Sequence, residues 1–132
     1  MTQSEMEKLQ KELNGLALGI GRKFSMELDY SIDSLRDVDK ILLEVHKDFE
    51  KTKDEHGIKG IALEFAAYIV NVIEKNNIVQ GNWERDSKDQ GKDTFPYNIN
   101  DGRTIFPYSW CLKMIIDGEA DNISNKFDSL LL

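Results

Sequence analysis

The sequence predicts an α+β fold, with three helices followed by a small antiparallel sheet of about three strands and then two short helices. Up to about residue 77, apolar side chains recur every three or four residues, which is the helical period. After Ile78 the periods shorten, and turn-forming residues separate short segments. Strands and helices do not alternate, so a parallel sheet with a nucleotide-binding crevice is not expected.

The first helix is predicted to begin at Thr2, which has capping-box spacing to Glu5. It is expected to end between Gly19 and Lys23. The glycine-rich run 15–21 lacks the Gly-Lys-Ser/Thr ending of a phosphate-binding loop, so we interpret its glycines as small residues for close helix packing. The predicted apolar stripe of this helix is Met6, Leu9, Leu13 and Leu16.

A second helix follows, with Ser31 as its predicted N-cap. Its apolar stripe is Leu35, Val38, Ile41, Leu42, Val45 and Phe49. The third helix, about residues 58–75, is apolar nearly all round, which is typical of a central helix covered on several sides. Asn76 and Asn77 are expected to end it.

The β-rich segment begins with a predicted strand from Ile78 to Arg85, with a bulge at Gly81. After a polar loop, residues 95–99 and 103–106 flank Asn100-Asp101-Gly102, which is a strong hairpin-turn signal. Pro96 lies in the first arm of this hairpin and predicts that the arm is an edge strand.

Pro107 is expected to stop the second arm and to start a helix, because proline suits the first helical turn. Trp110, Met114 and Ile115 would form the inner face of this helix, and Gly118 its C-cap. A last short helix is predicted over about residues 123–131, with Asp121 or Asn122 as its cap.

The chain is expected to form one domain, residues 1–132, with residues 1–27 as a peripheral N-terminal helix. Cys111 is its only cysteine, which excludes an internal disulfide and argues against a thiolate zinc site. The start of the chain lacks the apolar run of a secretory signal. These features predict a cytoplasmic protein.

Acidic side chains outnumber basic ones by 24 to 17, giving a net charge of −7. This surplus argues against nucleic acid and anionic membranes as partners. The longest apolar run, residues 65–70, is too short to span a bilayer. Acidity is compatible with a basic protein partner, although it is also a common means of staying soluble.

Four polar side chains are candidates for a pocket between the third helix and the sheet: Glu64, Asn71, His46 and Cys111. Glu64 and Asn71 share the polar stripe of that helix, but an amide carries protons poorly, so no catalytic pair is predicted. His46 lies one turn before Glu50, and a metal site there would need a further ligand, so no metal or cofactor is predicted. Cys111 has no neighbouring base in the sequence and is interpreted as a buried structural thiol.

Aromatic and arginine side chains gather in the last third of the chain, and binding hot spots are rich in both. A core position is favoured for this group as a whole and is expected for Trp110. Trp83 and Tyr97 are the members most suited to exposure, but the sequence does not place them inside or outside. The predicted contact residues on this side are Trp83, Arg85, Tyr97, Asp101 and Arg103. A second predicted contact surface is the acidic face of the second helix, formed by Asp33, Asp37, Glu44 and Asp48.

Short motifs carry a resemblance to a protein family. They are Leu-Asp-Tyr-Ser-Ile-Asp-Ser-Leu at residues 28–35, the apolar segment 68–73, Gly81-Asn82-Trp83, and a tail formed by Phe106-Pro107, Lys113 and residues 118–122. Through them, residues 28–130 resemble a group of small uncharacterised bacterial proteins. That group often carries Gly-Glu where this chain has Val70-Asn71. The resemblance implies a bacterial cytosolic α+β domain without an established activity.

Small acidic proteins of this kind include immunity proteins, which bind and block a toxin. The first functional hypothesis is therefore a non-catalytic protein-binding module, most concretely a toxin-neutralising protein whose partner is a basic toxin. A second hypothesis is a small enzyme or ligand-binding domain that uses the pocket described above. A third is a homo-oligomeric adaptor joined through the strand that contains Pro96.

Overall fold

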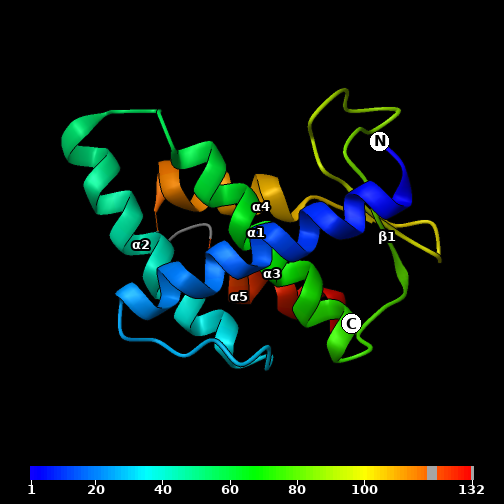
Figure 1. Ribbon diagram of the computed structural model, residues 1–132, viewed down its shortest axis with the longest axis horizontal. Helices are drawn as coiled ribbons and strands as arrows, with labels where there is room; N and C mark the ends of the chain where they lie inside the picture. The colour runs from blue at the N-terminus through cyan, green and yellow to red at the C-terminus, as the bar shows by residue number, and fades with distance from the viewer. Residues whose placement is uncertain (119–121, 132) are drawn as a thin grey trace.

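The computed structural model describes residues 1–118 and 122–131. Within these residues the chain forms helices, then a three-stranded antiparallel sheet, then short helices, which confirms the predicted α+β architecture. Figure 1 shows α2 (Ser34–Thr52) on one side of the molecule and the sheet on the other, with α3 (Ile58–Lys75) between them. None of the described helices is long and apolar enough to cross a bilayer.

Helix α1 (Gln3–Lys23) begins with the predicted capping box, in which Thr2 and Glu5 each accept the backbone N–H of the other. Its buried face differs from the predicted stripe, because Leu16 is 56% exposed. The residues that α1 buries are Met6, Asn14, Ala17 and Gly21. A Cβ on Gly21 would lie 3.0 Å from a methyl carbon of Leu28, so this glycine packs closely against the segment that follows α1. The predicted packing role is wrong for Gly15, where a Cβ would meet no atom within 4 Å.

Helix α3 covers the predicted range and is the central helix, packed mainly against α1 and against α4 (Pro107–Asp117). Helix α2 begins two residues later than predicted, with Asp33 rather than Ser31 at the N-cap position. Ser31 still acts in the turn before the helix, because its Oγ accepts the N–H of Ser34 at 3.1 Å.

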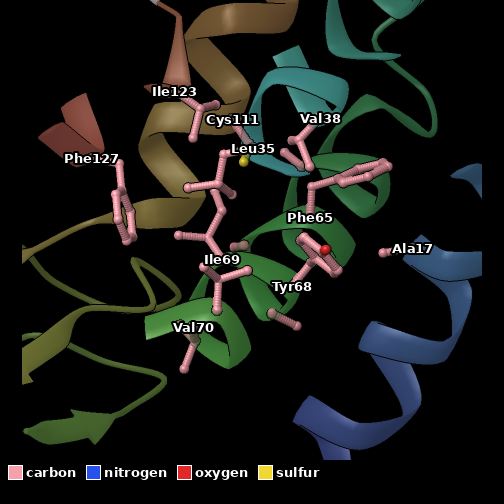
Figure 2. Close-up of a cluster of buried hydrophobic side chains, with 14 of the residues drawn as sticks. Ala17, Leu35, Val38, Phe65, Tyr68, Ile69, Val70, Cys111, Ile123 and Phe127 are labelled. Carbon is pink, nitrogen blue, oxygen red and sulfur yellow. The ribbon is translucent and has the colours of Figure 1, made fainter. Parts of the chain in front are cut away.

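The core lies where four helices meet. Figure 2 shows Val38 of α2 beside Phe65 of α3, and Leu35 of α2 near Cys111 of α4. Helix α5 (Ile123–Asp128), which continues as η2 (Ser129–Leu131), closes this cluster with Ile123 and Phe127. All of these side chains are buried, so α5 is part of the core rather than an appendage.

The sheet contains β1 (Gly81–Trp83), β2 (Tyr97–Ile99) and β3 (Thr104–Ile105) in that order. The predicted hairpin between the last two strands is confirmed, with Gly102 at φ +99° in its turn. The prediction for Pro96 was wrong, because β2 is the central strand. Pro96 stands just before the first paired residue of β2, where its missing N–H breaks no ladder bond.

Strand β1 is shorter than predicted, and it has no bulge at Gly81. Its register with β2 is continuous from Gly81↔Ile99 to Trp83↔Tyr97. Gly81 instead permits a close approach of strand β1 to strand β2, since a Cβ there would lie 2.3 Å from the carbonyl oxygen of Asn98.

The C-terminal helices follow the predicted signals at their ends. Pro107 is the first residue of α4, and Gly118 is its C-cap at φ +84°. Asn122 caps α5 by accepting the N–H of Asn125 at 2.9 Å. Trp110 is only partly buried, contrary to prediction, because Cys111 takes the innermost position on α4. The motif residues 119–121 lie outside the described part of the chain.

Candidate functional site

Trp83 and Tyr97 belong to the core, which decides a question that the sequence left open. Their exposed fractions are 7% and 1%. They pair across β1 and β2, so they share the sheet face that covers the core. Trp83 donates its indole N–H to the carbonyl oxygen of Phe95 at 3.0 Å, and burial with the charge of Glu74 raises the pKa of Tyr97 to about 12.

The charged side chains predicted around the hairpin are exposed, but they are paired with their neighbours. Arg85 Nε lies 2.6 Å from Asp93 Oδ1, and Arg103 Nε lies 2.8 Å from Asp101 Oδ2. The backbone N–H of Arg103 also holds the pKa of Asp101 below its usual value. These arginines are therefore less available to a partner than the sequence indicated.

The acidic face of α2 lies at the surface as predicted, although Asp37 is partly covered. Glu44 pairs with Lys47 at 3.1 Å, whereas the carboxylates of Asp33, Asp37 and Asp48 form no ion pair within the described residues. In Figure 1, α2 and the sheet stand on opposite sides of the molecule. One compact site cannot include both predicted surfaces.

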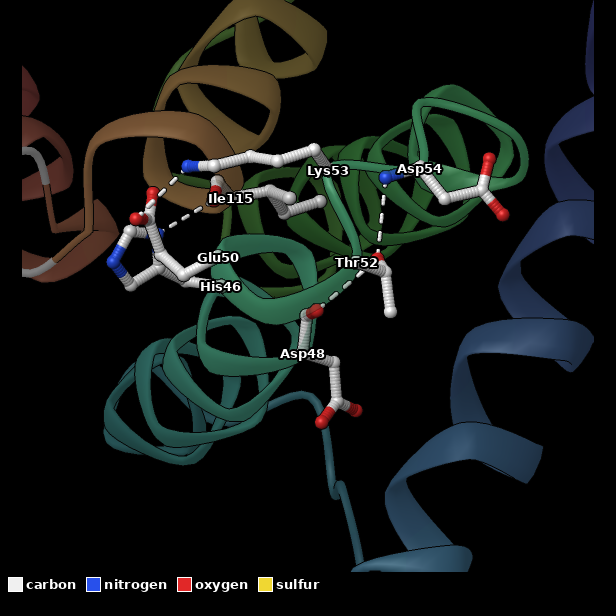
Figure 3. Close-up of polar contacts among 7 residues, drawn as sticks. All are labelled: His46, Asp48, Glu50, Thr52, Lys53, Asp54 and Ile115. Carbon is white, nitrogen blue, oxygen red and sulfur yellow. Dashed lines mark hydrogen bonds and ion pairs between the residues drawn. The ribbon is translucent and has the colours of Figure 1, made fainter.

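His46 is bound to α4 rather than to its neighbour on α2. Its Nδ1 lies 2.8 Å from the carbonyl oxygen of Ile115, and a carbonyl only accepts, so Nδ1 carries the proton. Glu50 pairs with Lys53 at 3.0 Å instead of with His46 (Figure 3). His46 thus joins two helices, and it packs so closely beneath Gly118 that a Cβ there would lie 2.9 Å from Nε2.

The other pocket candidates do not converge. Glu64 is partly buried on α3; burial raises its pKa and the charge of Lys23 opposes the shift. Asn71 donates to the carbonyl oxygen of Ala67 in its own helix at 3.3 Å. Cys111 is fully buried in the core, and burial raises its thiol pKa. The predicted pocket between α3 and the sheet is therefore not formed by these residues.

The structure instead contains a groove that sequence reasoning missed, between the first half of α1, the end of α3 and β1. We call it the α1–β1 groove; its volume is about 360 Å³. Trp83 and Arg85 line it, and Arg85 is held by Asp93. The carboxylates that line it are those of Glu7, Glu74, Glu84 and Asp86.

A second depression adjoins the groove along α1. This α1–α3 hollow has a volume of about 430 Å³ and shares Glu7, Gln10 and Glu74 with the groove. Gln10 donates to Glu74 at 2.9 Å and forms the bridge between the two depressions. The recurrence of polar residues at positions 7, 10, 11 and 14 is helically spaced and was the sequence signal for this surface.

Among the described residues, no group of three or more His, Cys, Asp or Glu side chains is placed to hold a metal ion. Comparison with protein-family models, curated proteins and solved structures gives no match to this chain. The resemblance to small bacterial proteins therefore stays a prediction, and function has to be argued from the surface itself.

Proposed function

We propose that this protein is a non-catalytic protein-binding module that takes a basic segment of its partner into the α1–β1 groove. The observation that carries the proposal is the charge of this groove. Glu7, Glu74, Glu84 and Asp86 face one arginine, which is already paired with Asp93. A cationic segment is the complement of such a surface, because a concave site lined mainly by one sign of charge concentrates its field.

The groove is suited to binding because its walls are helices and strands. Helix α1 packs against α3, and β1 is paired with β2 along its whole length. A partner would therefore meet side chains held on fixed backbones, which lowers the entropy lost on binding. Toxin neutralisation is the most concrete version of this function, with a basic bacterial toxin as the partner in the cytoplasm.

The two alternative functions have less support. The residues proposed for an enzyme or ligand pocket are dispersed over α2, α3 and α4. The strand proposed to join copies of the chain has a neighbour on each side, so it has no free edge for a further strand.

The test is affinity capture of the tagged protein from its native cytosol, followed by titration of any stoichiometric partner. Glu7→Lys in the groove and Asp48→Lys on α2 form a matched pair, because each changes the net charge from −7 to −5 on an exposed helical position. We expect Glu7→Lys to weaken binding by about tenfold or more and Asp48→Lys to have little effect.

A partner that responds to Asp48→Lys but not to Glu7→Lys would move the site to α2. A retained small molecule without a stoichiometric protein partner would contradict the protein-binding function. It would instead favour a small-ligand site in the depressions along α1.

A further inference from the structure

We propose that the α1–α3 hollow is an arginine-binding site, which receives the guanidinium group of one arginine side chain from the partner. This inference rests on the proposed function, since it names the anchor of a basic segment lying in the adjacent groove. It is carried by an unsatisfied buried acceptor and an immobilised aromatic ring, with two carboxylates beside them.

The unsatisfied acceptor is the side-chain oxygen of Asn14. Asn14 lies in the middle of α1, is 9% exposed and lines the hollow. Its Nδ2 donates to the hydroxyl of Tyr30, but Oδ1 has no hydrogen-bond partner, unlike every other buried side-chain oxygen or nitrogen of the described residues. A buried acceptor without a partner destabilises the fold, and a ligand that supplies an N–H removes this cost.

The aromatic ring is that of Tyr30, which is held from several directions. Its N–H donates to the hydroxyl of Tyr68 at 2.9 Å, its carbonyl accepts from Asn76 at 2.8 Å, and its ring stacks on Tyr68 with centroids 5.2 Å apart. Its backbone has φ +66°, a conformation rare for a side chain of this size. Such a strained residue persists only where its surroundings hold it, and here they fix one ring beside the hollow.

A cation already occupies the face of this ring. Lys75 Nζ lies 4.8 Å from the ring centroid of Tyr30. Lys75 is exposed and its side chain is long and flexible, so it is free to move into solvent when another cation arrives. A planar guanidinium stacks on an aromatic face better than an ammonium does, which favours arginine as the replacement.

The carboxylates of the hollow suit the same ligand. Glu7 and Glu74 line it together with Asn14. The two lysines that also line it, Lys11 and Lys75, are exposed and flexible enough to turn into solvent. A guanidinium presents five N–H donors in one plane, so it can donate to a carboxylate and, once the Asn14 side chain turns to expose its buried Oδ1, to that oxygen at the same time. A phosphate or carboxylate ligand lacks the donor that Asn14 Oδ1 requires.

The first experiment uses arginine blocked at both ends, N-acetyl-argininamide, as the probe. It is titrated into the ¹⁵N-labelled full chain while the side-chain amide signal of Asn14 is followed by NMR. We expect a saturable shift of this signal, and we expect the uncharged isostere N-acetyl-citrullinamide to bind at least about tenfold more weakly. No shift at Asn14, or equal binding of the two probes, overturns the proposal.

Two variants separate binding from folding. Asn14→Leu should weaken probe binding about tenfold and lower the melting temperature only slightly, because it removes an unsatisfied acceptor together with the one hydrogen bond to the Tyr30 hydroxyl. Lys75→Gln should strengthen binding severalfold, because it removes the cation that competes for Tyr30. Weaker binding by Lys75→Gln would mean that Lys75 contacts the ligand and would overturn the proposal, even if Asn14→Leu does not fold.

The same variants distinguish this inference from the proposed function. If a protein partner is lost with Glu7→Lys but retained in full by Asn14→Leu, the arginine site is wrong and the groove remains. If the blocked arginine binds at Asn14 but no protein partner is found, the proposed function is wrong and the hollow remains a guanidinium site.

Discussion

The side chain of Glu64 makes the stability of the folded protein depend on pH. Burial raises the pKa of its carboxyl group, and the charge of Lys23 opposes that shift. The folded protein therefore binds the Glu64 proton more tightly than the unfolded chain does. The stability that Glu64 contributes is complete below the ordinary glutamate pKa and is lost as the pH rises through the raised value.

Replacing Glu64 with glutamine removes this dependence, because the amide has no charge to desolvate. We expect Glu64→Gln to raise the free energy of unfolding at pH 7 by less than about 1 kcal/mol, since the side chain is partly exposed. The gain should vanish at about pH 4, where the native carboxyl is protonated. Urea unfolding at both pH values measures it, with the exposed Glu12→Gln as control; a gain of equal size at both pH values would contradict the assignment.

At the scale of elements, one aspartate attaches α5 to α2. Asp39 accepts the backbone N–H of Ile123 at 2.5 Å, and its other oxygen accepts the N–H and the hydroxyl of Ser124 at 3.1 and 2.6 Å. Asp39 thus caps a helix 84 residues away in the chain. The interaction explains how a helix of six residues keeps its place in the core.

Asp39→Ala should lower the free energy of unfolding by about 2 kcal/mol, because it removes a cap and leaves the two amides without their acceptor. Asp48→Ala is the matched control on the same helix, since its exposed carboxylate accepts no hydrogen bond from the described residues. Chemical denaturation of both variants measures the difference. Equal stabilities would show that water replaces the Asp39 cap.

Two glycines allow a paired test of the elements that contain them. Gly81 lies against the backbone of Asn98, whereas a Cβ on Gly60 in α3 would meet no atom within 4 Å. Gly81→Ala should destabilise by about 2 kcal/mol or more. Gly60→Ala should stabilise by up to about 1 kcal/mol, because alanine favours the helix. Thermal unfolding measures whether each substitution lowers or raises the melting temperature. A Gly81→Ala protein as stable as the original would contradict the close approach of β1 to β2.

At the scale of the whole molecule, the acidic surface of α2 and the α1–β1 groove are two separate surfaces. Residues 29–55, which include α2, contain nine acidic and five basic side chains and so carry −4 of the net −7. The α1–β1 groove is lined by the first half of α1 and by β1, and Figure 1 shows both of these segments on the side of the molecule away from α2. In a complex of the proposed kind, the charge of α2 would act on the partner at long range, whereas the groove would contact it.

This separation predicts how binding of a basic partner depends on salt. Raising the ionic strength from about 50 to 500 mM should slow association about tenfold or more and change dissociation less, because salt screens long-range attraction most strongly. Surface plasmon resonance over this range measures both rates. An association rate that does not change with salt would argue against an electrostatic role for the acidic surfaces.

The elements themselves were predictable because their signals are local. The capping box of α1, the apolar length of α3, the Asn-Asp-Gly turn and the Pro107 and Gly118 ends all depend on residues within a few positions of one another. Local geometry and hydrogen bonding decide such features, so they can be predicted without knowing what packs against them.

The candidate site depended on packing between distant segments. The sequence by itself determined the fold class, the order of the elements and the single buried thiol. Only the tertiary structure decided that Trp83 and Tyr97 face the core, that the strand after Pro96 is central, and that Asn14 rather than Leu16 points inward. Sequence periodicity shows that a helix or strand has an apolar face, but which residues are covered depends on the neighbours that arrive from elsewhere in the chain.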